Sequence, residues 1–429
     1  MNISQIEERI SFPVSNMAEN LQGSEIIKLA GEINEKILRG KKIFNFTIGD
    51  YDPEIFPIPE ELTSEIILAY QNKQTNYPAA NGIKALREAV SGFIEAYQGL
   101  KYGEDEFLIA GGARPLIYAA YQTLVDPGDK VVFPVPSWNN NHYTHLSGAQ
   151  AVFVETSPEH NFMPTAEELK AHLKGASLLS LCSPLNPTGT VFSEEGLREI
   201  CALVIQENES RPPGAKPLYL LYDQIYWMLT FGKTRHVDPV SLFPEIRPYT
   251  LYIDGISKSL AATGVRVGWA MGPAYIIDKM KSILGHIGAW APKAEQVATA
   301  KYLNNRQAVN NYIEKHKEKV RERLNSLYSG FISLESEGLP VRAISPQAAI
   351  YLTVCFSLVG KRTSNGNDLK TTEDVTRFLL EDSGIAMVPF SAFGASSDSN
   401  WYRISVGTCE IAQIEEVISS IRKSIQSLI

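Results

Sequence analysis

The stretch DGISKSLAATGVRVG occupies residues 254–268 and contains two cationic side chains, Lys258 and Arg266. A lysine on an ordinary loop is solvated and protonated, and an isolated Ser-Lys pair indicates nothing more. In a cleft, burial and a neighbouring cation such as Arg266 both disfavour the ammonium form, which makes a lysine a nucleophile toward an aldehyde. The fold around this stretch therefore decides whether Lys258 is a reactive amine or an ordinary solvated lysine.

The sequence on both sides of this stretch predicts a large α/β domain. Between residues 46 and 300, short apolar runs alternate with longer helical patterns. Several runs lack polar alternation, as expected for strands that are buried on both faces. These runs occupy residues 130–135, 178–182, 218–222 and 250–253. We therefore expect residues 46–305 to form a mostly parallel sheet wrapped by helices.

The pattern changes after residue 307. Charged helical, strand-like and helical segments follow one another at residues 312–327, 349–356 and 372–381, before a closing helix after Ile411. This mixture predicts a smaller α+β domain at residues 306–429.

The N-terminal segment, residues 1–45, contains an amphipathic stretch at 24–38. We expect this segment to pack on the smaller domain. Two domains of this kind create a ligand cleft between them.

Residues 255–268 resemble the Schiff-base signature of the class I/II aminotransferases. In that signature a glycine or serine lies three residues before the lysine and Arg-x-Gly begins eight residues after it, as Gly255 and Arg266 do here. The resemblance implies the PLP-dependent transferase fold (fold type I), with Lys258 carrying pyridoxal 5'-phosphate, Ser257 beside it and Arg266 binding its phosphate. Many relatives have a phosphate-binding serine where this chain has Gly255, so we expect that contact to come from elsewhere.

Other motifs of the same family follow in the expected order. Asn186 opens an Asn-Pro-x-Gly element, which alone would indicate only a turn. In the family its amide binds the phenolic oxygen of the cofactor, and Tyr226 binds the same oxygen. Asp223 ends a buried run, where open α/β sheets collect ligands, although a helix cap is the simpler interpretation. The resemblance makes Asp223 the partner of the protonated ring nitrogen, which the cofactor needs as an electron sink.

The upstream segment AGGARPLIY at residues 110–118 resembles the glycine-rich phosphate loop of the family. Gly112 permits a tight turn, and the backbone N–H groups near Ala113 and Arg114 at a helix start point toward an anion. Arg114 has three open interpretations, namely the phosphate, a substrate carboxylate or an ordinary ion pair. Trp138 lies where the family places an aromatic ring over the pyridine, with a core tryptophan as the alternative.

Three further residues extend the resemblance toward both ends of the chain. Arg403 corresponds to the arginine that binds the substrate α-carboxylate, and its planar guanidinium suits that task because it can form two parallel hydrogen bonds to a carboxylate. Gly49 matches the glycine turn that approaches the same carboxylate. Phe390 replaces the usual glycine of the preceding segment. Tyr77 matches a tyrosine that reaches the phosphate in the neighbouring subunit, so the resemblance implies a homodimer with shared active sites.

Composition excludes several other classes. The net charge of −8 over 429 residues, with scattered basic side chains, argues against a nucleic-acid partner. Four cysteines show no Cys-x-x-Cys spacing that would indicate a metal site. No secretory leader and no apolar run long enough to span a bilayer is visible, so we expect a cytoplasmic protein without membrane contact.

The function implied by the resemblance is a ping-pong transfer of an amino group from an amino acid to a 2-oxoacid. A PLP-dependent lyase, racemase or decarboxylase on the same fold stays open, because these motifs do not resolve the grip on the substrate. A PLP-binding sensor is a further alternative. It requires an appended DNA-binding domain, and the roughly forty residues before the first motif are too few and too acidic for one. The sequence does not identify the amino donor or the acceptor.

Overall fold

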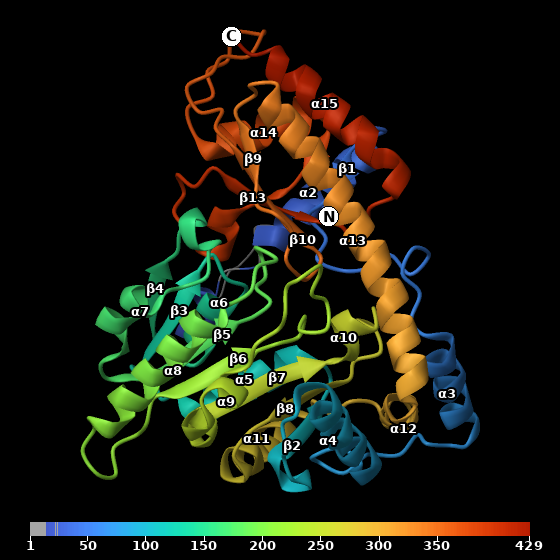
Figure 1. The fold of residues 1–429 in the computed structure, drawn as a ribbon, viewed down its shortest axis with the longest axis vertical. Coiled ribbons are helices and arrows are strands. Elements are labelled where there is room, and N and C mark those ends of the chain that lie inside the picture. Colours follow the sequence, from blue (N-terminus) through green and yellow to red (C-terminus); the bar gives the residue numbers. More distant parts are fainter. Residues whose placement is uncertain (1–13, 22, 24) are drawn as a thin grey trace, which may run out of the picture.

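The computed structural model describes residues 14–21, 23 and 25–429, which form two lobes with separate sheets (Figure 1). The large lobe is built on a seven-stranded sheet. In spatial order its strands are β2 (Phe107–Ala110), β8 (Gly268–Met271), β7 (Thr250–Gly255), β6 (Tyr219–Asp223), β5 (Ala176–Cys182), β3 (Lys130–Val135) and β4 (Gln150–Glu155). All strands from β7 to β4 are parallel, and β8 is antiparallel to both of its neighbours. The expected mostly parallel sheet is confirmed.

Alternate side chains of the central strands enter two different hydrophobic cores. In β6, Leu220 and Tyr222 face one core and Leu221 faces the other. The first core includes residues of α3 (Glu60–Gln71), α4 (Lys84–Gln98), α7 (Ala166–Leu173), α8 (Glu194–Glu209), α9 (Pro239–Leu242) and α12 (Lys293–Asn304). The second includes residues of α5 (Ala113–Leu124), α6 (Asn140–Leu146) and α11 (Ala274–Ile287). Burial on both faces explains why these strands show no polar alternation.

The small lobe has a four-stranded antiparallel sheet and three helices. The strands are β12 (Val388–Pro389), β13 (Trp401–Ser405), β10 (Tyr351–Phe356) and β9 (Val341–Ala343) in spatial order. The helices are α13 (Arg306–Ser336), α14 (Thr372–Asp382) and α15 (Ile414–Gln426). The helix expected at 312–327 is the middle of the longer α13, which begins after Asn305 because that side chain caps the N–H of Ala308. Figure 1 shows α13 running along both lobes.

The N-terminal segment contacts both lobes in its described part. Its helix α2 (Glu25–Leu38) is followed by β1 (Phe44–Asn45), which pairs in parallel with β11 (Ile385–Ala386) of the small lobe. The short α1 (Asn16–Glu19) lies near the large lobe, where the ring of His145 contacts the carbonyl of Met17 at 2.8 Å. Residues 1–13, 22 and 24 lie outside the described residues, and the division at residues 45 and 305 stays a prediction.

Short 3-10 helices connect these elements at Glu104–Glu106, Pro158–His160, Pro244–Tyr249, Phe390–Phe393 and Ile411–Gln413. Within the described part of the chain, no helix is both long and apolar enough to cross a membrane. The four cysteines carry free thiols.

Candidate active site

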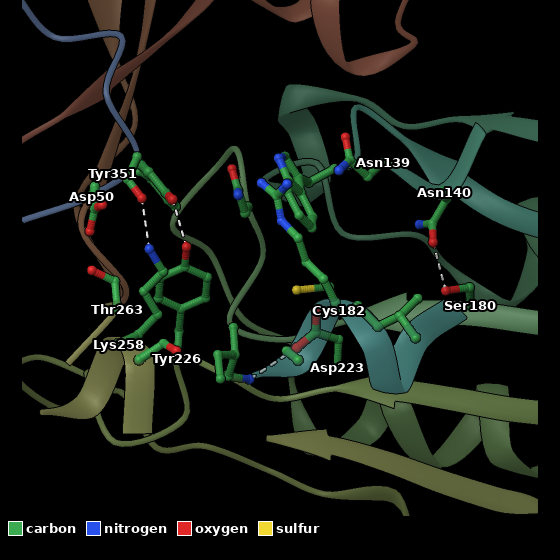
Figure 2. A pocket seen from close by; sticks show the side chains of 18 of the residues that line it. Asp50, Asn139, Asn140, Ser180, Cys182, Asp223, Tyr226, Lys258, Thr263 and Tyr351 are labelled. Atoms are coloured by element: carbon green, nitrogen blue, oxygen red, sulfur yellow. Dashed lines mark hydrogen bonds between the residues drawn. The ribbon is translucent and has the colours of Figure 1, made fainter. Parts of the chain in front are cut away.

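A cavity of about 560 Å³ opens where the two lobes meet, at the carboxyl ends of β5 and β6. Figure 2 shows Lys258 and Tyr226 along one side of it, with Asp223 on the sheet below. Most of the residues expected from the motifs line this one cavity. They are Gly49, Ala113, Arg114, Trp138, Asn186, Asp223, Tyr226, Ser257, Lys258, Arg266 and Arg403.

Lys258 lies at a junction between a strand and a short helix. Strand β7 ends at Gly255, and α10 (Ile256–Ser259) begins at once, so the lysine is fixed by the sheet behind it. Its Nζ atom donates a hydrogen bond to the carbonyl oxygen of Gly49 at 2.7 Å. The N-terminal glycine turn and the lysine motif therefore meet in the fold, although 209 residues separate them.

Burial lowers the pKa of Lys258 to about 8. The carboxylate of Asp50 opposes this shift, while the guanidinium groups of Arg403 and Arg114 assist it and Arg266 contributes least. At pH 7 a lysine with such a pKa is neutral for about one molecule in ten, far more than an exposed lysine. The site thus supplies a usable fraction of nucleophilic amine.

Asp223 is a carboxylate without a cationic partner among the described residues. Its Oδ1 atom accepts a hydrogen bond from the N–H of Ile225 at 3.1 Å. Burial raises its pKa to about 6, and that single N–H pulls the other way. The residues that follow form a turn and not a helix, so Asp223 caps no helix here. A protonated nitrogen of a bound ring would stabilise this carboxylate.

Arg403 is a buried cation without a carboxylate. It is 2% exposed, and no ion pair of the described residues includes it. Its Nη1 donates to Oδ1 of Asn186 at 3.0 Å, and its Nη2 donates to the carbonyl oxygen of Thr47 at 2.6 Å. The Nε atom is buried without a partner in the described chain. Burial lowers the pKa of this guanidinium, and an incoming carboxylate would offset that cost.

Three close neighbours of these groups were missed from the sequence. Tyr351 shares a hydrogen bond of 2.6 Å with the hydroxyl of Tyr226 and lies 4.8 Å below the guanidinium of Arg403. Asp50 lines the cavity next to Lys258 (Figure 2). Cys182 lines it beside Asp223. Tyr351 belongs to a run expected to be a strand, and nothing in that run distinguishes it from a core tyrosine.

The opposite end of the cavity is formed by the start of α5 and the guanidinium of Arg266. Gly112 has φ of 92°, and α5 begins at the next residue. A Cβ atom on Gly112 would lie 2.3 Å from Nη2 of Arg266, whose guanidinium is fixed by the carbonyl oxygens of Gly111 and Thr263 at 2.7 Å each. The start of a twelve-residue helix and an adjacent arginine form an anion-binding site. Gly112 packs behind this site and does not line the cavity.

The structure explains why Gly255 departs from the serine of many relatives. A Cβ atom at this position would lie 2.8 Å from both the Cα of Gly268 and the carbonyl oxygen of Val267. Both contacts are with backbone, which cannot move aside without shifting β8. Ser257 lines the cavity and provides a hydroxyl there.

Arg114 and Trp138 contact each other within the cavity. The guanidinium carbon of Arg114 lies 4.7 Å from the centre of the Trp138 ring. No ion pair in the described part of the chain involves Arg114, so the ordinary ion pair considered from the sequence is not present there. Arg114 is therefore a second cation in the cavity that has no anionic protein partner.

Tyr77 lies outside this cavity. Its side chain is 81% exposed and packs edge to face against Trp290, with ring centres 5.2 Å apart. A single chain gives Tyr77 no contact with the groups described above.

Pyridoxal 5'-phosphate fits the groups that this cavity brings together. Its phosphate matches the helix start and Arg266, its aldehyde matches the neutral amine of Lys258, and its ring nitrogen matches the buried carboxylate of Asp223. The buried Nε of Arg403 is left for the carboxylate of an amino acid. The fold and the cavity thus define a pyridoxal-phosphate-dependent enzyme of fold type I.

Comparison with known proteins places the chain within this class. Residues 41–421 match the profile of the family "Aminotransferase class I and II", and the chain belongs to that family. It is similar to the aspartate aminotransferase of Rhizobium meliloti (strain 1021), with 28% identity over 424 residues and 98% of each chain covered. It is also similar to the asparagine–oxo-acid transaminase of Streptococcus mutans, with 27% identity and coverage of 94% and 97%.

Solved structures agree with this assignment. The crystal structure of aspartate aminotransferase from Rhizobium meliloti has a TM-score of 0.89 and 27% identity, covering 98% of this chain and all of that one. The Thermus thermophilus aspartate aminotransferase with maleate has a TM-score of 0.85 and 25% identity, covering 96% and 100%. The predicted fold type, cofactor and transaminase activity are confirmed, and a lyase, racemase, decarboxylase or sensor is not favoured.

Proposed function

We propose that this aminotransferase uses a dicarboxylic amino acid, with aspartate as the first donor to test. The observation that carries the proposal is the presence of two arginines, Arg403 and Arg114, that lie in one cavity without an anionic protein partner. A substrate with two carboxylates neutralises both. The names of the relatives from Rhizobium meliloti and Thermus thermophilus support the same substrate class.

Arg403 binds the α-carboxylate in this proposal. Asn186 and the carbonyl of Thr47 fix the guanidinium from two sides, which leaves the remaining donors directed at a ligand. Because Asn186 Oδ1 accepts from Arg403, the two N–H groups of the Asn186 amide stay available for the phenolic oxygen of the cofactor. Tyr226, held by Tyr351, donates toward the same oxygen.

Lys258 carries the proton in the proposed reaction. When bound, the cofactor supplies an electron sink for the negative charge that develops at the substrate α-carbon. The neutral Nζ atom of Lys258 takes the proton from that carbon, which its lowered pKa permits near neutral pH. With the cofactor bound, Asp223 would keep a positive charge on the ring nitrogen and Trp138 would cover the ring. Each half of the ping-pong cycle uses these groups in the same places.

The active unit in this proposal is a homodimer. Tyr77 is exposed, while its counterpart in the resembling family binds the phosphate of a neighbouring subunit. A second copy of the chain would bury Tyr77 and complete the anion-binding end of each cavity. We also propose that residues 46–305 form the domain that holds the cofactor, that residues 306–429 form the small C-terminal domain, and that the enzyme works in the cytoplasm, where its four free thiols stay reduced.

A single-turnover assay without acceptor tests the substrate. Purified holoenzyme is mixed with aspartate, asparagine, alanine or lysine, and the released oxoacid is quantified by mass spectrometry. We expect one equivalent per site, with aspartate reacting at least about a hundredfold faster than alanine. Arg114→Gln should remove most of that preference, because its effect on the pKa of Lys258 acts on aspartate and alanine alike, whereas the loss of the second cation acts on aspartate alone. Equal rates for aspartate and alanine in the native enzyme would contradict the proposal.

A further inference from the structure

The loop at residues 47–51 contacts Lys258 at both its side-chain amine and its main-chain carbonyl. The carbonyl oxygen of Gly49 accepts from Nζ at 2.7 Å, and the hydroxyl of Tyr51 donates to the main-chain carbonyl oxygen of Lys258 at 3.0 Å. The helix that carries Lys258 has only four residues, and the N–H of Ala261 just after it reaches the Lys258 carbonyl oxygen at 3.4 Å, so the Tyr51 hydroxyl is the closer donor. Tyr51 satisfies the carbonyl of the residue whose side chain performs the chemistry.

The hydroxyl of Tyr51 is itself oriented by His316 of α13. The Nε2 atom of His316 lies 3.1 Å from the Tyr51 oxygen. A tyrosine has one hydroxyl proton, and Tyr51 directs it to Lys258, so Nε2 must carry the proton of the second bond. The contacts therefore run in one direction, from the His316 N–H to the Tyr51 hydroxyl and on to the Lys258 carbonyl.

Aromatic packing holds His316 in place. Its ring stacks on Tyr312 with centres 5.5 Å apart, and Phe56 meets it edge to face at 5.5 Å. The hydroxyl oxygen of Tyr312 lies 2.8 Å from the carbonyl oxygen of Pro57 and 3.1 Å from that of Leu260, just past the end of the lysine helix. Burial lowers the pKa of His316 to about 4, while the backbone of Lys258 opposes that shift, so the ring is neutral at pH 7.

The same loop also holds the arginine at the substrate carboxylate. The carbonyl of Thr47 accepts from Nη2 of Arg403, the carbonyl of Gly49 accepts from Nζ of Lys258, and Tyr51 continues the alternation two residues later. Thr47, Gly49 and Tyr51 thus each contact either Arg403 or Lys258. The donor amino acid must lie between those two side chains.

We propose that Tyr51 is a positioning residue for proton transfer by Lys258, with His316 orienting its hydroxyl. The inference rests on the proposed role of Lys258 as the proton carrier. Tyr51 touches neither cofactor nor substrate, and it acts by fixing the backbone from which the Lys258 side chain extends. Its loss changes the alignment of Nζ with the α-carbon and leaves binding of the donor and of the cofactor intact.

Tyr51→Phe is the first variant, because it removes the hydroxyl and keeps the ring that packs against Phe56 and His316. In holoenzyme with aspartate we expect kcat to fall roughly 10–100-fold with KM within about twofold. The primary deuterium isotope effect on kcat from α-deuterated aspartate should increase. The cofactor retained after gel filtration, read from its visible absorbance, should equal that of the native enzyme.

Tyr222→Phe is the matched control. Tyr222 is also fully buried, and its hydroxyl donates to a main-chain carbonyl, that of Val237, at 2.8 Å. It therefore reports what the loss of one buried tyrosine-to-carbonyl bond does by itself. We expect kcat and the isotope effect to stay at native values in this variant. Equal losses of kcat in Tyr51→Phe and Tyr222→Phe would overturn the proposal, as would a loss in Tyr51→Phe that is confined to KM or to cofactor retention.

His316 provides a second and independent measurement. His316→Phe keeps the stacking but removes the donor, whereas His316→Gln retains an N–H donor. We expect His316→Phe to lower kcat severalfold, His316→Gln to recover part of it, and the double variant with Tyr51→Phe to be no worse than Tyr51→Phe alone. Additive losses in the double variant would contradict the relay from His316 to Tyr51.

The role of Lys258 is tested separately, so the two failures are distinguishable. If Lys258→Ala kept native proton-transfer rates, the proposed function would fail whatever Tyr51 does. If Lys258→Ala is inactive and Tyr51→Phe behaves as Tyr222→Phe, only the positioning role fails.

Discussion

The two ends of the cavity are built in different ways. At the anion-binding end, Gly112, Gly255 and Gly268 pack so closely that an added Cβ would meet a neighbour within 3.0 Å, namely the guanidinium of Arg266 at Gly112 and backbone atoms at the other two. At the substrate end, the groups are long side chains, and Arg403 and Lys258 are held by hydrogen bonds to a distant loop. The first end is a fixed cradle, and the second depends on contacts between the lobes. The comparison predicts that changes at the two ends affect different measurements.

Lys258→Ala should have the largest effect, because it removes the proton carrier and the covalent attachment of the cofactor together. We expect activity to fall by roughly 10⁴-fold, the upper end for loss of a general base. Borohydride reduction followed by peptide mass spectrometry should locate the cofactor on Lys258 in the native enzyme and on no lysine in the variant. A label recovered on another lysine would show that the substrate end is assigned to the wrong residue.

Arg403→Ala should come next and should act mainly on the substrate. Removal of a buried partner of a carboxylate costs about 2–5 kcal/mol, so kcat/KM for aspartate should fall by roughly 30-fold or more. Arg403→Lys should be intermediate, since it keeps the charge and loses the fork. Cofactor affinity should be native in both variants. If all three proteins bound the donor equally, the α-carboxylate would be held by another group.

Gly268→Ala should have the opposite effect to Arg403→Ala, because it should weaken cofactor binding and leave substrate binding unchanged. Its Cβ would lie 2.7 Å from the backbone carbon of Gly112, and the phosphate loop must shift to admit it. We expect cofactor dissociation measured by equilibrium dialysis to increase by roughly 10–100-fold, with KM for the donor unchanged once the cofactor is saturating. A change confined to KM would remove the distinction between the two ends.

A change on the far side of the sheet should affect neither end, and His236→Phe provides that case. Burial lowers the pKa of His236 from 6.5 to about 3. Between these two values the imidazole is neutral in the folded chain and protonated in the unfolded chain. Its contribution to stability is therefore complete above pH 6.5 and is lost as the pH falls from 6.5 toward 3.

Between pH 7 and pH 5 the native protein should lose about 2 kcal/mol of unfolding free energy relative to His236→Phe. Urea unfolding at the two pH values measures this difference, and activity at pH 7 serves as the control. Parallel pH dependence in both proteins would show that His236 is solvated in the native state.

The difference between the anion-binding end and the substrate end also determines which site residues could be predicted from the sequence. The cradle is built from two short motifs, at residues 110–118 and 255–268, and glycines that tolerate no Cβ are visible in both, so the sequence predicts Gly112 and Arg266 as parts of it. The doubly buried strands were equally visible because both cores are apolar. The loop contacts were not visible, because Tyr51 and His316 are 265 residues apart and either is an unremarkable core side chain by itself.

Two further gaps have separate physical causes. Tyr351 became a site residue only through its bond to Tyr226, which depends on how the lobes meet. Tyr77 is exposed in a single chain, so the role across a subunit interface that its motif predicts stays a prediction.

The long helix α13 is packed into the cores of both lobes. Its first part, with Val309 and Ile313, belongs to the core of the large lobe, and its second part, from Val320 onward, belongs to that of the small lobe. His316 lies in the short interval between them. The residue that orients the Tyr51 hydroxyl therefore lies where the helix passes from one core to the other. A rotation of the small lobe about this interval would displace the Tyr51 contact less than it would displace the ends of α13.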